Sequence, residues 1–218
     1  MWINFWNIFA KVTGWPIQWI CFRTKIYYED KSEQSRRISG PAIIVSNHTS
    51  VFDYAVYLFV FFSRTLRFQM AELLFDKKPL GILLRCLGGI YVNRNSHDLS
   101  FVRKSEEILS DRGVVGVFPE GRLPREGEER PLPFASSVAY LALYSNVPII
   151  PVYTNGSYFR RERARVIIGR PINVFQLIDA DSSEKDNLVR ATSEIRNRII
   201  ALGKELDEKI KREKAFCC

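Results

Sequence analysis

The segment AIIVSNHTSVFD, residues 42–53, joins a strand pattern to a helix pattern through a histidine and a carboxylate. The apolar run at 42–45 predicts a buried β-strand. His48 follows the strand, Asp53 lies five residues further on, and the apolar segment at 54–62 predicts a buried helix. Proteins of the α/β class place reactive groups where strand ends lead into loops. The segment therefore predicts an α/β fold with a reactive pair at the end of its first core strand.

The chemistry that suits this pair is proton abstraction from a hydroxyl group. Neutral imidazole accepts a proton readily near neutral pH. A carboxylate beside His48 would fix its tautomer and stabilise the imidazolium that forms. The spacing between His48 and Asp53 also arises by chance, and a histidine at this position can instead cap the following helix or fill the core.

Three further blocks follow along the chain. GIYVNR occupies 89–94 and ends in an arginine. A strand pattern at 114–118 runs directly into FPEGR, residues 118–122. VPIIPV at 147–152 is another strand pattern and follows a helical segment. The order and spacing of the four blocks carry more information than the histidine and carboxylate alone.

NHTSVFD, GIYVNR, FPEGR and VPIIPV together resemble the glycerolipid acyltransferase family, which includes the 1-acyl-sn-glycerol-3-phosphate (lysophosphatidate) acyltransferases. The resemblance covers residues 38–170. It implies transfer of a fatty acyl group from acyl-CoA or acyl-carrier protein to the free hydroxyl of 1-acyl-glycerol-3-phosphate. The product would be phosphatidic acid, a precursor in phospholipid synthesis. The reaction it implies requires no cofactor and no metal beyond the acyl thioester, because a thiolate is a fair leaving group.

The same resemblance implies roles for the remaining motif residues, beside His48 as the base and Asp53 as its partner. Arg94 and Arg122 are expected to grip the acceptor phosphate, because a guanidinium donates paired hydrogen bonds from a planar fork. Glu120 and Gly121 would complete that site. Asn47 is a candidate substrate contact, and its amide and nearby backbone amides are candidate donors to the reaction's oxyanion.

The chain departs from the family pattern in two places. Many family members have a threonine between the glycine and the arginine of the FPEGR block, whereas Arg122 follows Gly121 directly. Relatives often carry Lys-Gly after the phenylalanine that matches Phe134, and this chain has Ala-Ser-Ser at 135–137. The first departure puts the direction of Arg122 in doubt, and the second removes any contact made by that lysine.

All four tryptophans lie within residues 1–28, the predicted N-terminal membrane-associating segment. Gly14 and Pro16 predict a break between a first helix and a second at 16–26. Tryptophan favours the headgroup level of a bilayer, so we expect an interfacial helical hairpin in one leaflet. The alternative is that the aromatic side chains pack on the body of the domain. The first helix would place Trp2, Phe5, Trp6, Phe9 and Val12 on one face and Asn4, Asn7 and Lys11 on the other.

Residues 29–218 are long enough for one α/β domain with a substantial core. The formal net charge is +8, which favours an anionic partner. No nucleic-acid-binding motif is present, so membrane phospholipid and lysophospholipid are the expected partners. No uncharged run reaches the roughly 18 residues that a membrane-spanning helix needs, so we expect monotopic or peripheral attachment at the cytoplasmic face of a membrane. The four cysteines show neither metal-ligand nor disulfide spacing, which favours a reducing compartment.

The alternation of strand and helix patterns predicts a central, mostly parallel or mixed sheet flanked by helices, with the interfacial hairpin in front of it. Further strands are expected at 66–70, 89–92 and 165–168. Helices are expected at 71–86 with an interruption at 79–81, at 99–109, at 134–144 and at 188–214.

Two other functions fit parts of the same pattern. In a thioester or lipid hydrolase, His48 would activate water and release free acid. A non-catalytic peripheral membrane protein would bind through its aromatic N-terminus and would not need His48. Within the acyltransferase hypothesis, glycerol-3-phosphate and other lysophospholipids are alternative acceptors.

Overall fold

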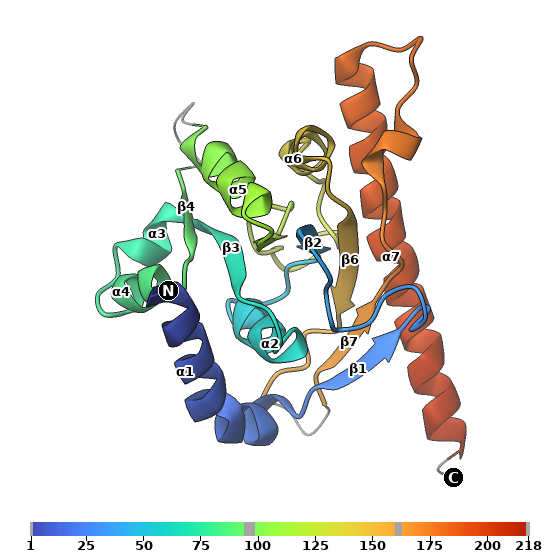
Figure 1. Cartoon of the computed structure of the whole chain (residues 1–218). Coiled ribbons are helices and arrows are strands. Elements are labelled where there is room, and N and C mark those ends of the chain that lie inside the picture. The colour runs from blue at the N-terminus through green and yellow to red at the C-terminus, as the bar shows by residue number, and fades with distance from the viewer. Residues whose placement is uncertain (1, 94–98, 160–162, 217–218) are drawn as a thin grey trace.

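The computed structural model describes residues 2–93, 99–159 and 163–216 (Figure 1). Within these residues the chain forms one seven-stranded sheet in the order β1-β7-β6-β2-β5-β3-β4. Neighbouring strands run parallel except β6 and β7, which are antiparallel. The expected α/β architecture with a mostly parallel, mixed sheet is confirmed.

The six expected strands lie within two residues of their predicted positions. The strands are β1 (Lys25–Tyr28), β2 (Ala42–Ser46), β3 (Leu66–Ala71), β4 (Ile90–Val92), β5 (Val114–Val117), β6 (Ile149–Thr154) and β7 (Arg165–Ile168), of which β1 was not expected. The helices are α1 (Trp2–Ile17), the π-helix η1 (Gln18–Phe22), α2 (Asp53–Val60), α3 (Glu72–Phe75), α4 (Leu80–Cys86), α5 (Ser100–Ser110), α6 (Ser137–Ser145), the 3₁₀-helix η2 (Val174–Leu177) and α7 (Glu184–Phe216).

The central strand of the sheet is β2, between β5 and β6. Ile44 is in register with Gly116 of β5 and Ile150 of β6, and both pairings are parallel. All five residues of β2 are buried, as expected for a strand covered on both faces. Because the three strands are parallel, the segments that follow β2, β5 and β6 meet at one edge of the sheet.

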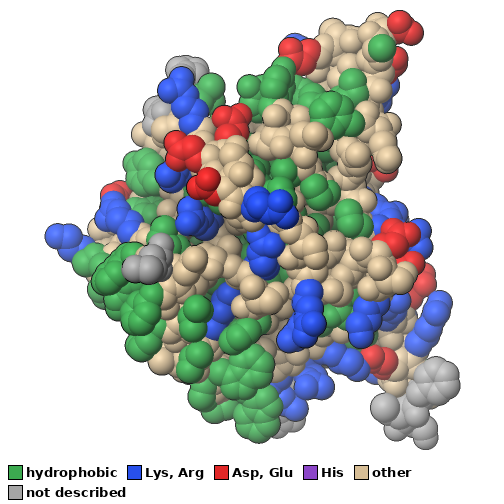
Figure 2. Space-filling model, viewed as in Figure 1, with side chains coloured by type: hydrophobic (Ala, Val, Ile, Leu, Met, Phe, Trp, Pro, Cys, Tyr) green, Lys and Arg blue, Asp and Glu red, His purple; other side chains and the backbone are tan. Residues whose placement is uncertain are grey.

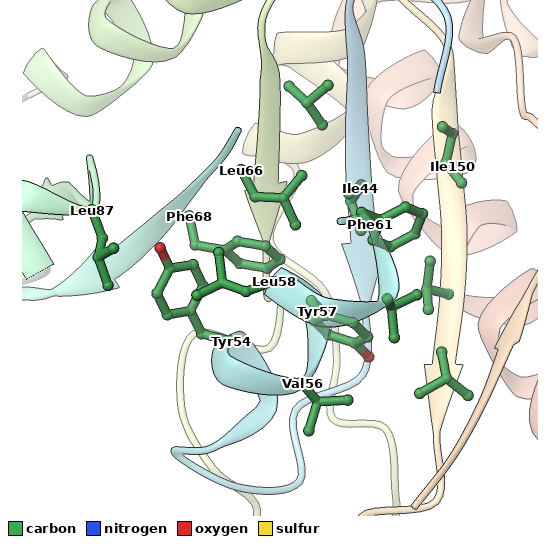
Figure 3. Close-up of a cluster of buried hydrophobic side chains, with 14 of the residues drawn as sticks. Ile44, Tyr54, Val56, Tyr57, Leu58, Phe61, Leu66, Phe68, Leu87 and Ile150 are labelled. Atoms are coloured by element: carbon green, nitrogen blue, oxygen red, sulfur yellow. The ribbon is translucent and has the colours of Figure 1, made fainter. Parts of the chain in front are cut away.

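Successive residues of β2 face two different cores. Ile44 packs with Tyr57 of α2 and with Phe61, which follows that helix, and Figure 3 shows these residues together with Phe68 of β3. Ile43 faces the opposite side, where α5, α6 and α7 cover the sheet. Both faces of the sheet therefore bury apolar side chains.

The N-terminal segment differs from the expectation in its boundaries. α1 runs through Gly14 and Pro16 to Ile17, and the second helix is the five-residue η1, which ends at Phe22. The prediction of a helix to residue 26 is wrong, because Lys25–Tyr28 form β1, hydrogen-bonded to β7. Alternation explains the strand: Tyr27 is buried against Leu202 and Leu206 of α7 while its neighbours are partly exposed.

Two residues of the predicted polar face of α1, Asn7 and Lys11, point into the protein, whereas the third, Asn4, is exposed. Asn7 and Lys11 are 0% and 3% exposed. Asn7 Nδ2 donates to the carbonyl of Leu87 at 2.8 Å, and Lys11 Nζ donates to the carbonyls of Phe62 at 3.0 Å and Arg64 at 2.6 Å. Burial lowers the pKa of Lys11 to about 8.

The apolar face of α1 points outward, where Figure 2 shows hydrophobic side chains gathered at the lower left. Trp6 is the partial exception, since it packs against the core. No helix in the described part of the chain combines the length and apolar character needed to cross a bilayer. The apolar side chains of α1 that are at least 49% exposed are Trp2, Phe5, Ile8, Phe9, Val12, Trp15 and Ile17.

Candidate active site

His48 and Asp53 meet at the carboxyl end of β2. His48 lies in the loop after the strand, and Asp53 is the first residue of α2. His48 Nδ1 lies 2.9 Å from Asp53 Oδ2. An ionised carboxylate only accepts hydrogen bonds, so Nδ1 carries the proton and Nε2 keeps its lone pair. The His48 ring also stacks on Phe118, with ring centroids 4.3 Å apart, which fixes its plane.

The Asp53 carboxylate is fully buried and accepts five hydrogen bonds. Oδ2 accepts from His48 Nδ1, from the Thr49 N–H at 2.7 Å and from the Ser50 N–H at 3.0 Å. Oδ1 accepts from the Thr49 hydroxyl at 2.8 Å and the Tyr158 hydroxyl at 2.7 Å. These donors replace the water that burial removes and hold the carboxylate toward the imidazole.

Glu120 follows β5 and accepts a hydrogen bond from the main chain of the loop that carries His48. Its Oε1 accepts from the His48 N–H at 2.7 Å, and its Oε2 accepts from the Leu132 N–H at 2.9 Å. Burial raises the pKa of this carboxyl group, while the two backbone donors oppose the rise. The predicted substrate contact through Glu120 stays a prediction, and the structure adds a role in fixing His48.

Asn47 joins the ends of β2 and β6. Its Nδ2 donates to the carbonyl of Thr154 at 2.9 Å, and its Oδ1 accepts from the Thr154 N–H at 2.9 Å. The side chain is buried, and its amide pairs with the N–H and C=O of Thr154 as the backbone of a neighbouring strand would. Its predicted contact with substrate also stays a prediction.

Gly121 and Arg122 lie in the turn after β5. Gly121 has φ +69°, which favours glycine, and its N–H donates to the carbonyl of Phe118 at 3.1 Å. Arg122 forms a two-pronged ion pair with Glu128, with both N–O distances 2.7 Å. This pair lowers the pKa of Glu128 to about 2. The predicted phosphate ligand therefore has a carboxylate partner in this structure.

Arg94, the other predicted phosphate ligand, lies outside the described residues. Within the described ranges, no group of three or more histidine, cysteine, aspartate or glutamate side chains is arranged to hold a metal ion.

Sequence reasoning missed Tyr158 and the stacking role of Phe118. Phe118 is the first residue of the FPEGR block, and its position directly after β5 was a usable signal. Tyr158 lies 105 residues from Asp53, and only its place shortly after β6 indicates this edge of the sheet. A strand end locates a segment, but it does not say which side chain of the segment turns inward.

Comparison with known proteins agrees with this geometry. The family model described as Acyltransferase matches residues 23–155, more than half of the chain. The 1-acyl-sn-glycerol-3-phosphate acyltransferase beta of Homo sapiens is 26% identical over 173 residues, covering 78% of this chain and 61% of the human protein. The 1-acyl-sn-glycerol-3-phosphate acyltransferase of Bacillus subtilis is 26% identical over 140 residues, covering 62% of this chain and 67% of that protein.

A solved structure shares the fold. The 1-acyl-sn-glycerophosphate (LPA) acyltransferase PlsC from Thermotoga maritima superposes with a TM-score of 0.63 at 20% identity, covering 92% of this chain and 79% of that one. The chain spans about three fifths of the length of the human relative. By the family match over most of its sheet, the chain belongs to the acyltransferase family.

Proposed function

We propose that the protein transfers a fatty acyl group from acyl-CoA or acyl-carrier protein to the free hydroxyl of 1-acyl-glycerol-3-phosphate, giving phosphatidic acid. The observation that carries the proposal is the contact between His48 Nδ1 and Asp53 Oδ2, which leaves Nε2 as a proton acceptor. Family membership and the names of the relatives support the choice of reaction and of acceptor.

In the proposed mechanism, Nε2 of His48 removes the proton of the acceptor hydroxyl as its oxygen attacks the thioester carbonyl. Asp53 stabilises the imidazolium that results. Collapse of the tetrahedral intermediate breaks the carbon–sulfur bond, and the imidazolium returns its proton to the departing thiolate. Holding acceptor and donor together at His48 supplies much of the rate, and no acyl-enzyme is needed.

The acceptor phosphate would be held by Arg122, with Arg94, Glu120, Gly121 and Asn47 as the other proposed contacts. Arg122 is exposed beside the turn after β5, so it can exchange the Glu128 carboxylate for a phosphate with similar geometry. On this proposal Arg122→Gln raises KM for the lysolipid and leaves kcat nearly unchanged.

We also propose that α1 lies in the interface of one leaflet at the cytoplasmic face. Its outward side chains form an exposed apolar surface rich in tryptophan and phenylalanine, which suits the headgroup level. Two of its polar side chains, those of Asn7 and Lys11, make their hydrogen bonds inside the protein.

The test is an acyl-transfer assay with purified protein, labelled acyl-CoA or acyl-carrier protein, and a panel of lysolipids and glycerol-3-phosphate. Phosphatidic acid should form, and His48→Ala should lower kcat by roughly 10²–10⁴-fold. His97→Ala, which changes the other of the two histidines, is the control. Release of free acid alone would support a hydrolase. Equal product from wild type and His48→Ala would remove His48 from the mechanism.

A further inference from the structure

The loop after β6 brings a buried tyrosine to the catalytic carboxylate. Tyr158 is 6% exposed, and its hydroxyl donates to Asp53 Oδ1 at 2.7 Å. The Thr154 hydroxyl lies 3.0 Å from the hydroxyl oxygen of Tyr158. Since Tyr158 has one hydroxyl proton and gives it to Asp53, Thr154 must donate to Tyr158. The three side chains form a directed chain of hydrogen bonds that ends on the carboxylate.

Tyr158 differs from the other donors to Asp53 in where it comes from. The other described donors belong to His48, Thr49 and Ser50, all within five residues of Asp53. Those local bonds let the loop and the first turn of α2 move as one unit. Tyr158 is 105 residues away and ties Oδ1 to a different part of the sheet edge. Because Tyr158 holds Oδ1 from a segment distant in the sequence, Oδ2 stays directed at the imidazole of His48.

The hydroxyl of Tyr158 remains a donor at all working pH values. Burial and the negative charge of Asp53 both raise the pKa of Tyr158. The phenol therefore stays protonated and does not compete with Asp53 for a proton.

The loop that carries Tyr158 is held by the end of the N-terminal helical segment. The ring of Phe22, the last residue of η1, meets the Tyr158 ring edge-on with centroids 5.5 Å apart. The Phe159 N–H donates to the Cys21 carbonyl at 3.1 Å, and the Ala164 N–H donates to the Phe22 carbonyl at 2.9 Å. These contacts connect η1 to the middle of the loop and to its last residue before β7.

The backbone at this junction adopts conformations that side chains disfavour. Arg23, directly after η1, has φ +47°, and Phe159 has φ +57°. A left-handed conformation costs a non-glycine residue roughly 1–2 kcal/mol, so it persists where the surrounding contacts impose it. A π-helix is also uncommon and occurs often at functional sites.

We propose that Tyr158 is a positioning residue that orients the Asp53 carboxylate toward His48, and that the end of η1 holds Tyr158 in place. The inference rests on the proposed function, because it assigns Tyr158 to the same proton transfer. It links the segment proposed to lie on the membrane to the geometry of the base.

The first test is Tyr158→Phe, which removes the hydroxyl and keeps the ring. A hydrogen bond to a charged group contributes enough that we expect kcat to fall about tenfold. KM for both substrates should stay within about twofold of wild type. The matched control is Tyr54→Phe, since the buried hydroxyl of Tyr54 has no hydrogen-bond partner among the described residues. It should behave as wild type.

A second readout does not depend on turnover. Proton NMR should show a downfield resonance for the His48 Nδ1–H, assigned by its loss in His48→Ala. This resonance should move upfield or broaden in Tyr158→Phe and stay in place in Tyr54→Phe. If kcat and the resonance are both unchanged in Tyr158→Phe, the positioning role is wrong. If wild type transfers no acyl group, the proposed function fails, and the resonance still tests Tyr158.

The link to η1 is tested with Phe22→Leu. It should lower kcat less than Tyr158→Phe does, and the double variant should lose no more than Tyr158→Phe alone. Phe75→Leu is the control, because Phe75 is equally buried and lies in α3. Multiplicative losses in the double variant would show that Phe22 acts independently of Tyr158 and would overturn this half of the proposal.

Discussion

At the scale of single residues, two carboxylates of the candidate active site accept hydrogen bonds from backbone N–H groups. Glu120 accepts from the main chain of His48 and from that of Leu132, one on each oxygen. It therefore fixes the position of the catalytic loop relative to the end of β5. Asp53 does the same for the main chain of Thr49 and Ser50 while it faces the imidazole.

Glu120→Gln tests this role. An amide has one oxygen, so its NH₂ group would face one of the two backbone N–H donors and leave it unpaired. We expect the free energy of unfolding to fall by about 1–3 kcal/mol and kcat to fall at least about tenfold. Urea unfolding and the acyl-transfer assay measure the two effects. Glu107→Gln, which removes an exposed carboxylate paired with Lys104, should change neither; a wild-type kcat in Glu120→Gln would contradict the role.

At this scale the sequence predicted the pair but not its support. His48 and Asp53 are five residues apart, and a strand-to-helix pattern brings them together by local geometry. Tyr158 and the backbone of Leu132 reach the site through the tertiary fold, and no local spacing marks them. Arg122 was predicted as a phosphate ligand, and the carboxylate that pairs with it, Glu128, carries no motif of its own.

At the scale of elements, α1 is attached through its polar side chains. Lys11 donates to the carbonyls of Phe62 and Arg64, which follow α2, and so bridges the first helix and the end of the second. The hydrophobic pattern separates the two faces of α1 in part, because Trp6 of the apolar set packs against the core and Asn4 of the polar set is exposed. It does not say which face points inward, because that depends on the carbonyl acceptors that follow α2 and α4.

The buried Lys11 makes stability depend on pH. Burial lowers its pKa from 10.5 to about 8, so between these values the unfolded chain binds a proton that the folded chain does not. Below pH 8 the folded state bears the full cost of a buried ammonium group. Stability attributable to Lys11 should therefore rise from about pH 8 to about pH 10.5.

Urea unfolding of wild type and Lys11→Met at pH 7, 8, 9 and 10 measures this dependence as the difference between the two proteins. Lys104→Met, which changes an exposed lysine, should give a difference that is flat with pH. A flat difference for Lys11→Met as well would mean that the amine is not desolvated.

The outward face of α1 is tested by flotation with vesicles that contain anionic phospholipid. Phe5→Ser with Phe9→Ser removes two rings that are 57% and 50% exposed, and we expect bound protein to fall at least about tenfold. Phe175→Ser, which removes a 51% exposed ring from η2, is the matched control. Equal flotation of all variants would contradict an interfacial role for α1.

At the scale of the whole molecule, helices on the two faces of the sheet both reach the end of the sheet where His48 and Asp53 lie. On one face, α2 begins with Asp53. On the other, Arg196 of α7 donates to the carbonyls of Pro131 at 2.6 Å and Leu132 at 3.1 Å. Leu132 in turn donates to Glu120. Hydrogen bonds thus connect a C-terminal helix to the loop that carries His48.

Arg196→Met should leave two partly buried carbonyls without their donor and loosen the segment that binds Glu120. We expect the free energy of unfolding to fall by about 1–3 kcal/mol and kcat to fall several-fold. Arg190→Met is the control, because Arg190 also lies on α7 and donates to a backbone carbonyl, that of Leu177 at the end of η2, which is not part of the loop that carries His48. Equal kcat losses in the two variants would show a general effect of stability.

The fold as a whole was largely predictable, because strands that alternate with helices favour a parallel sheet with both faces covered. The exceptions are at one end of the sheet. The first two residues of β1 fall within the helix predicted at 16–26, because the strand follows an aromatic helical segment and its alternation is only four residues long. The antiparallel pairing of β6 and β7 was not predicted, because no sequence motif indicates the direction in which the chain returns after β6.

The outward rings of α1 also matter where no lipid is present. Water forms a hydration shell over exposed indole and phenyl groups, and two copies that meet ring to ring release it, a gain of roughly 25 cal/mol per Å². Because these rings occupy one side of the molecule, the expected species is a small cluster with rings inside and charged side chains outside, much like a micelle. Light scattering from protein in plain buffer should then fall to the size of one chain when a nonionic detergent is added.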